Sequence, residues 1–449
     1  MFRTNPVYYL ILTWLFLSAG LFAQNISFKH LTKENGLSNN RIYDVIQDKN
    51  GFIWLATDDG LNRYDGYNFK VYQHKKNDRS SLSNNSVWVL FEDENGFIWL
   101  GTKNGELNRY DPKTDKFTHW EIKSDIVKEN SIKTIYQDSK GAIWIGTYKS
   151  GLYRFDPATK QTENWRNDPN NDLSLSNNYV TSILEDREGN LLVSSYIGLN
   201  KFNYHKSKNK FMRYLNGPAN PNSLSNNLIW ALSKSENDPA AIWIGTADGL
   251  TKYNSQQEKF FRLEIPNPDK MQFGSSAGNV IEEVIGGQNI LWCDSYAGLM
   301  RIDQNTGSTE RFVSNKNNPN QIIHNQINKI IKDRSGVIWI ATENGLSYYS
   351  PKNSKFNNHF IYKTQEYDLS LLKDKNVTAI TKSADGTIWF GTDEGLFSSV
   401  NSNGRTILKK YSGVSDLHIW SLASDPSGSL WIGTYGSGLI HLDVKNGQI

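Results

Sequence analysis

The sequence GFIWLATDDGLNRYD at residues 51–65 decides the fold, because near-copies of it recur along the chain. Trp54 lies in a short apolar run, and a Thr-x-x-Gly turn leads from it into a second run, LNRY. The remaining copies align with Trp54 on Trp99, Trp144, Leu192, Trp243, Trp292, Trp339, Trp389 and Trp431. Neighbouring copies are 42 to 51 residues apart, which is the period of a four-stranded propeller blade rather than of a typical solenoid repeat.

Each copy belongs to a longer unit that is predicted to form four strands. The first strand is an aliphatic run such as Ile42–Val45, and the second contains the frame tryptophan. The third follows the Thr-x-x-Gly turn, and the fourth is an aromatic run such as Phe69–Tyr72. One such sheet cannot bury both of its faces alone, so the units are expected to stack around an axis. Leu192 is also apolar, so its unit counts as a blade.

Composition excludes several classes of protein. The chain has 449 residues, 49 Lys and Arg, 46 Asp and Glu, and a net charge of +3. The basic residues are dispersed, which disfavours a nucleic-acid-binding face. Cys293 is the single cysteine, so an intrachain disulfide and a cysteine-cluster metal site are excluded. The eight histidines lack metal-ligand spacing, and no metal or cofactor is predicted.

The N-terminus predicts export. Arg3 precedes an uncharged apolar run at residues 7–22, and Ala23 then offers a small residue for cleavage. This order is typical of a secretory signal peptide, predicted at residues 1–23. The alternative is an uncleaved membrane anchor, but the run is short for a span of about 20 residues.

The number of units predicts two domains. Nine blades exceed the usual four to eight, so residues 24–351 are predicted to form a seven-bladed β-propeller. Its N-terminal strand, residues 26–31, is expected to complete the sheet begun by Ile327–Tyr349. Residues 352–449 would then begin a second, truncated propeller of two blades, with Phe356–Tyr362 as its opening strand. Because an open ring exposes strand edges, the chain is expected to be a fragment.

At this point the repeat resembles a known family. The frame G-x-I-W-[IL]-[GA]-T-x-x-G-L-x-[RK]-[YF]-D, preceded by L-S-N-N-x-[IV], is similar to the two-component regulator propeller repeat across essentially residues 25–449. The resemblance implies the periplasmic sensor of a Bacteroidetes hybrid two-component system, whose full-length receptor lies in the inner membrane and carries a histidine kinase. It also implies an oligosaccharide ligand and a homodimer. The sequence departs from that pattern because it contains no kinase and no receiver.

Two columns of the repeat are expected to face a ligand over the central channel. They mix aromatic rings, which stack on sugar faces, with polar groups that bind hydroxyls. The alternative is that each residue packs between blades or lies solvated in a turn. The first column contains Tyr43, Trp88, Lys133, Thr181, Trp230, Glu282 and Asn328. The second contains Asp58, Lys103, Tyr148, Tyr196, Ala247, Tyr296 and Glu343.

The sequence is compatible with three candidate functions. The favoured one is a periplasmic sensor for a small-molecule ligand, an oligosaccharide, with membrane contact only through segments outside this sequence. The second is an exported scaffold that binds proteins or glycans. The third is a polysaccharide lyase or hydrolase, which would need paired carboxylates at the channel mouth. No catalytic residue is predicted, because no H-E-x-x-H or G-x-S-x-G motif occurs, and Cys293 beside Trp292 is interpreted as a small buried residue.

Overall fold

The computed structural model describes residues 26–122, 130–207, 210–265, 276–285, 287–350, 367–368, 370–372, 375–402 and 405–449. The predicted signal peptide and the predicted strand at residues 356–362 lie outside these residues. The described part consists of β-strands and two short 3-10 helices, Lys33–Asn35 and Ser370–Leu372. The chain divides into two compact units, Met1–Phe356 and Asn357–Ile449. The all-β prediction is confirmed.

The described residues of the first unit form seven four-stranded antiparallel sheets. The first two sheets are β2 (Ile42–Gln47), β3 (Ile53–Thr57), β4 (Gly60–Tyr64), β5 (Phe69–Tyr72), and β6 (Val87–Glu92), β7 (Ile98–Thr102), β8 (Glu106–Asp111), β9 (Lys116–Glu121). The next two are β10 (Ile132–Gln137), β11 (Ile143–Thr147), β12 (Leu152–Phe155), β13 (Thr162–Trp165), and β14 (Val180–Glu185), β15 (Leu191–Ser195), β16 (Leu199–Phe202), β17 (Phe211–Tyr214). The fifth and sixth are β18 (Ile229–Lys234), β19 (Ala241–Thr246), β20 (Leu250–Asn254), β21 (Lys259–Leu263), and β22 (Val280–Ile285), β23 (Gln288–Ser295), β24 (Gly298–Asp303), β25 (Thr309–Phe312).

The seventh sheet joins the two ends of this unit. It contains β26 (Ile327–Lys332), β27 (Ile338–Thr342), β28 (Gly345–Tyr349) and, from the N-terminus, β1 (Lys29–Leu31). Strand β1 pairs antiparallel with β28, so that Lys29 lies opposite Tyr348. Just before β1, the buried ring of Phe28 packs against Phe312 and Tyr349, with ring centroids 5.5 and 6.0 Å apart.

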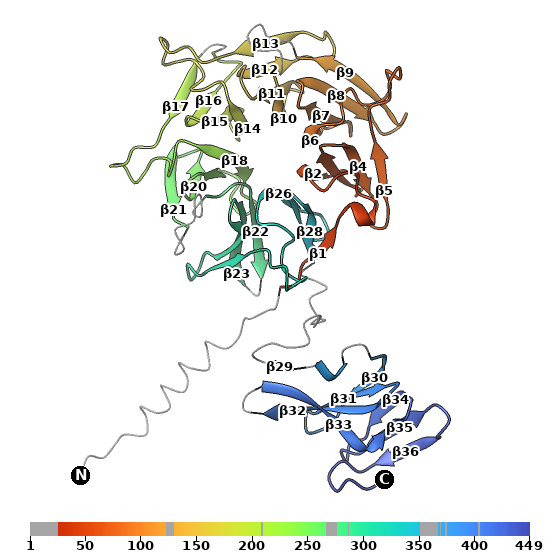
Figure 1. Cartoon of the computed structure of the whole chain (residues 1–449). Helices are drawn as coiled ribbons and strands as arrows, with labels where there is room; N and C mark the ends of the chain where they lie inside the picture. The colour runs from red at the N-terminus through yellow and green to blue at the C-terminus, as the bar shows by residue number, and fades with distance from the viewer. Residues whose placement is uncertain are drawn as a thin grey trace, which may run out of the picture. The chain divides into compact units, whose positions relative to one another are not determined.

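The first strands of the seven sheets surround a common centre (Figure 1). Strands β2, β6, β10, β14, β18, β22 and β26 each contact the next in this order, and β26 contacts β2. The innermost strands therefore form a closed ring, and the sheets radiate outward from it as blades do in a propeller. Residues on these inner strands consequently line the centre of the unit.

A carboxylate anchors most frame tryptophans between the sheets. Trp144 is fully buried, and its indole Nε1 donates to Asp138 Oδ2 at 2.7 Å. The other oxygen of Asp138 accepts from the backbone N–H groups of Lys140 and Ala142. The side chain of Asp138 thus closes the hairpin turn before β11 and also satisfies the buried indole, as buried polar groups require. The same arrangement joins Asp48 to Trp54, Asp93 to Trp99 and Asp333 to Trp339.

In the second unit, the described residues form two further sheets. Strands β29 (Tyr367–Asp368), β33 (Arg405–Ser415), β32 (Gly395–Ser402), β31 (Ile388–Thr392) and β30 (Val377–Lys382) form a five-stranded sheet in this order. Strands β34 (Ile419–Ser424), β35 (Leu430–Thr434) and β36 (Leu439–Leu442) form a three-stranded sheet. Trp389 is 3% exposed, because β34 packs beside its strand, whereas Trp431 in the last sheet is 42% exposed. No helix within the described residues is long and apolar enough to cross a membrane.

Candidate functional site: a central channel with an aromatic rim

In most sheets of the first unit, a β-bulge on the inner strand directs one residue to the channel. In six of the seven sheets of the first unit, the pairing register shifts by one residue near the start of the first strand. A bulge leaves one residue unpaired and redirects its side chain. The bulged residues are Tyr43, Trp88, Lys133, Thr181, Trp230 and Asn328, which are the first predicted column without Glu282.

The prediction that Glu282 faces the channel is wrong, because its place in the sheet differs from that of the other column residues. In the sixth sheet Ile281 lies opposite Trp292, as Ile46 lies opposite Trp54 in the first sheet. The residue that corresponds to Tyr43 is therefore Gly278, four positions before Glu282. Glu282 is 4% exposed and lies between the fifth and sixth sheets, where its carboxylate accepts hydrogen bonds from Trp243 Nε1 at 2.7 Å and from the hydroxyl of Ser235.

Aromatic rings from successive sheets form a nearly continuous series that we call the aromatic rim. Tyr43 and Trp88 have ring centroids 5.3 Å apart. On the next sheets, Tyr179 lies 4.3 Å from Tyr148 and 3.7 Å from Tyr196. Trp230 continues the series, 6.0 Å from Tyr196 and 5.4 Å from Tyr296. The rim comprises Tyr43, Trp88, Tyr148, Tyr179, Tyr196, Trp230 and Tyr296.

Polar side chains complete the rim between the seventh and first sheets. The Tyr43 hydroxyl donates to Asp58 at 3.1 Å, and Arg41 lies 3.6 Å from the same carboxylate. Arg41 also forms an ion pair with Glu343, which in turn accepts from Asn328 Nδ2 at 3.0 Å. Burial and the neighbouring Asp58 raise the pKa of Tyr43 to about 12, so this phenol stays protonated at neutral pH. This part of the rim is a hydrogen-bonded network.

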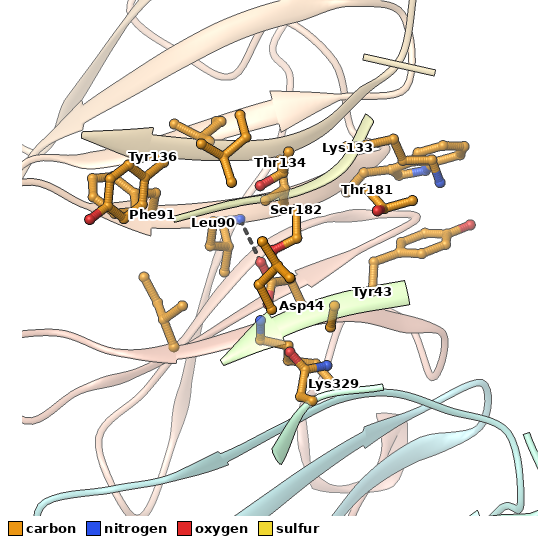
Figure 2. A pocket seen from close by; sticks show the side chains of 18 of the residues that line it. Tyr43, Asp44, Leu90, Phe91, Lys133, Thr134, Tyr136, Thr181, Ser182 and Lys329 are labelled. Carbon is orange, nitrogen blue, oxygen red and sulfur yellow. Dashed lines mark hydrogen bonds between the residues drawn. The ribbon is translucent and has the colours of Figure 1, made fainter. Parts of the chain in front are cut away.

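A cavity of about 530 Å³ runs inside the ring. Figure 2 shows Lys133, Thr181 and Tyr43 toward one end of the cavity, and Phe91 and Tyr136 toward the other. Asp44 lies between them and accepts hydrogen bonds from the backbone N–H groups of Leu90 and Val45. Burial raises the pKa of Asp44, and the positive charge of Lys329 opposes that rise. The cavity therefore offers aromatic faces, hydroxyls and charges of both signs.

A smaller cavity of about 160 Å³ adjoins the first between the fifth, sixth and seventh sheets. Trp230, Asn279, Asp294, Tyr296 and Asn328 are among the residues that line it. Asp294 is 5% exposed, and its Oδ1 has no hydrogen-bond partner among the described residues. Burial consequently raises the pKa of this carboxyl to about 6.

We expect the substitution Asp294→Asn to stabilise the first unit at pH 7.5 by about 3 kcal/mol, with little gain at pH 4. Between about pH 4 and 6 the folded protein keeps a proton on Asp294 that the unfolded chain has released, so the free energy of unfolding falls as the pH rises through this range and levels off above it. Urea denaturation of both proteins at the two pH values measures the difference. An equal change at pH 4 and 7.5 would contradict the assignment to this carboxyl.

The two predicted columns differ in how many of their residues line the cavities. Apart from Glu282, the first column lines one or both cavities. In the second column only Tyr296 does so; Asp58, Tyr148, Tyr196 and Glu343 contact the lining residues or other members of the rim. Lys103 and Ala247 line neither cavity.

Sequence reasoning missed Tyr179, Asp44 and Asp294. Tyr179 occupies the variable position of the L-S-N-N-x-[IV] motif, so its aromatic identity was an available signal. Asp44 directly follows the variable column and introduces a charge into an otherwise apolar strand. Asp294 follows Cys293 at a frame position that is Gly or Ala in most copies, and this departure was equally visible.

The structure also bears on whether Cys293 could act as a nucleophile and whether a metal ion could be held. Cys293 is fully buried, and burial raises the pKa of its thiol. The thiolate required of a nucleophile is therefore disfavoured. Within the described part of the chain, no group of three or more His, Cys, Asp or Glu residues is arranged to hold a metal ion.

Comparison with a family model identifies the repeats. The model, described as the two component regulator propeller, matches residues 36–59, 81–104, 127–149, 174–196, 321–344, 371–394 and 413–436. The chain carries two-component regulator propeller repeats. Each match within the first unit spans a polar loop, a bulged inner strand and the frame strand, which are the parts that build the channel.

Two of the similar proteins are longer than this chain. This chain is 41% identical to histidine kinase P4 of Formosa agariphila over an alignment of 73 residues. The alignment covers 16% of this chain and 5% of the kinase. The extracellular domain of a hybrid two component system from B. thetaiotaomicron superimposes with a TM-score of 0.61 at 23% identity, covering 94% of this chain and 54% of that one. The chain thus spans about half the length of that solved structure.

A solved enzyme shares the propeller-like fold. A streptogramin B lyase superimposes with a TM-score of 0.53 at 13% identity, covering 72% of this chain and 98% of the lyase. At this identity the likeness concerns the fold alone.

Proposed function

We propose that this chain is the ligand-sensing part of a hybrid two-component receptor, and that its ligand is an oligosaccharide. The aromatic rim around the central cavity is the observation that carries the proposal. The two-component regulator propeller repeats and the likeness to extracellular domains of two-component systems support the sensor role. In this role the chain is exported to the periplasm, contributes no catalytic residue, and acts through a kinase elsewhere in the receptor.

The chemistry of the channel suits a sugar. Aromatic rings bury the apolar faces of a pyranose, and Trp88 and Trp230 provide such rings on different sheets. Thr181, Asn279 and Asn328 add groups that exchange hydrogen bonds with hydroxyls. A cavity of about 530 Å³ falls within the usual range of small-molecule sites.

We also propose how the chain is divided into propellers. Residues 24–351 form a complete seven-bladed propeller, and residues 352–449 begin a second one. The exposed Trp431 supports this assignment, because the equivalent Trp389 is buried by the sheet that follows it. Trp431 lies where a further sheet would cover it.

Signalling requires that the ligand distinguish two states. The ligand must bind one arrangement of the receptor more tightly than the other, since equal affinity shifts no equilibrium. We propose that the receptor is a homodimer and that this difference is transmitted between its two copies to the kinase.

Binding of oligosaccharides by the purified chain tests the proposal. We expect a glycan to bind in isothermal titration calorimetry, and the substitution Trp230→Ala to weaken binding at least about tenfold, because an aromatic face is lost. Phe261→Ala is the matched control, since Phe261 is 51% exposed on β21, the outer strand of the same sheet. Unchanged affinity in Trp230→Ala, with an unchanged melting temperature, would contradict the site. Absence of glycan binding across a broad panel would contradict the ligand class.

A further inference from the structure

We propose that the rim contains a subsite for an anionic group, and that the ligand is an acidic oligosaccharide bearing a carboxylate or a sulfate. Lys133 provides the cation of this subsite. The inference rests on the proposed function, because it concerns the same channel. It adds the charge class of the glycan and the position at which the charge is bound.

Lys133 points into a box of aromatic rings from three sheets. Its Nζ lies 3.8 Å from the ring centroid of Trp88, and 5.9 Å from the centroids of Tyr148 and Tyr179. Lys133 is the bulged residue of β10, which explains why its side chain faces the channel instead of the neighbouring sheet. Figure 2 shows Lys133 beside Thr181 at the end of the cavity.

Lys133 differs from the other channel cations in having no counter-charge. Arg41 is paired with Asp58 and Glu343, and Lys329 acts electrostatically on both Asp44 and Asp294. In the described residues no carboxylate forms an ion pair with Lys133. Burial alone lowers the pKa of its ammonium to about 8, and no neighbouring charge opposes this effect.

An unpaired, largely desolvated ammonium is costly, and aromatic faces compensate for only part of that cost. An anion that enters the box would provide the missing charge. An ammonium acts as a point charge with rotatable donors, so it can bind a planar carboxylate and a tetrahedral sulfate equally well. The rings of Trp88 and Tyr148 would flank the sugar that carries the anion, and the hydroxyl of Thr181 could contact it.

The acidic groups of the channel lie elsewhere and orient the ligand. Asp44 lies inside the cavity, where the charge of Lys329 acts on it, and Asp58 and Glu343, on the first and seventh sheets, pair with Arg41. Asp294 belongs to the sixth sheet. The anionic group is therefore favoured beside Lys133, on the third sheet, and the neutral sugar rings of the ligand occupy the rest of the channel.

The test compares three probes by titration calorimetry at pH 7: tetragalacturonate, a sulfated carrageenan tetrasaccharide and neutral cellotetraose. We expect an acidic probe to bind, and Lys133→Met to weaken that binding at least about tenfold. Lys140→Met is the matched control, because it removes the same charge from an exposed turn of the same sheet, and we expect unchanged affinity. Whether the uronate or the sulfate binds decides which acidic group the subsite takes.

Raising the pH provides a second readout that needs no substitution at Lys133. Affinity for the acidic probe should fall steadily between pH 7 and 9.5 as the ammonium loses its proton, since its pKa is about 8. The titratable groups that face it are Tyr148 and Tyr179, and burial raises the pKa of Tyr179. Lys133→Arg, whose side chain remains charged, should remove the dependence.

The outcomes separate this inference from the proposed function. If cellotetraose binds in the channel and neither acidic probe does, the inference is overturned and glycan sensing stands. Acidic binding that Lys133→Met leaves unchanged, in a variant with normal melting, also overturns it. If no glycan in a broad panel binds, the oligosaccharide ligand of the proposed function is contradicted, and this inference fails with it.

Discussion

Replacing Phe28 with Asp is expected to lower the free energy of unfolding of the first unit by about 4 kcal/mol or more. Phe28 is 2% exposed; its ring packs edge-on against Phe312 in the sixth sheet and in a tilted orientation against Tyr349 in the seventh. The substitution removes a large buried ring and introduces a carboxylate without a partner. It also weakens the docking of β1, which leaves the edge of β28 unpaired.

Lys29→Asp is the matched control for this experiment. Lys29 is the next residue, pairs with Tyr348 in the same strand, and is exposed. Urea denaturation followed by tryptophan fluorescence should show a large loss of stability for Phe28→Asp and a change below about 0.5 kcal/mol for Lys29→Asp. Similar stabilities of the two variants would show that the N-terminal strand does not hold the ring closed.

The substitution Asp138→Ala is expected to lower the free energy of unfolding by about 3 kcal/mol. It removes the acceptor of the buried Trp144 indole and two hydrogen bonds that close the turn before β11. Because the indole N–H would remain buried without a partner, the loss should exceed that of an ordinary hydrogen bond, which is about 1 kcal/mol.

A double-mutant cycle with Trp144→Phe identifies the indole contribution. Phenylalanine lacks the N–H group, so Asp138→Ala should cost less in the Trp144→Phe background, by about 1 kcal/mol or more. Denaturation curves of the four proteins measure this coupling. Additive effects would assign the role of Asp138 to the turn alone and would refute the proposed anchoring of Trp144.

The repeated frame predicted the strands well, because its apolar runs and Thr-x-x-Gly turns are local features. Alignment on Trp54 also identified the residues that become bulges in six sheets. The prediction failed for Glu282, because the pairing of β22 with β23 has no bulge and the residue that corresponds to Tyr43 is Gly278, which precedes β22.

The remaining parts of the site depend on contacts between sheets. Tyr179 matters because Tyr148 approaches it from the neighbouring third sheet, while Tyr196 lies beside it on its own fourth sheet. Asp44 matters because it accepts a hydrogen bond from the backbone N–H of Leu90 on the inner strand of the second sheet. The lack of a counter-charge beside Lys133 is likewise a property of the assembled ring. Spacing within one repeat carries no information about these neighbours.

The pairing of β1 with β28 also has a consequence for biogenesis. His30 and Ser347, whose side chains form a hydrogen bond, are 317 positions apart in the chain. Contacts of such sequence separation form slowly, since a very long loop must close before they contribute. During synthesis the first strand therefore has no partner until nearly the whole unit has emerged from the ribosome. The ring can therefore close only after that point, even though the other six sheets pair strands that follow one another in the sequence.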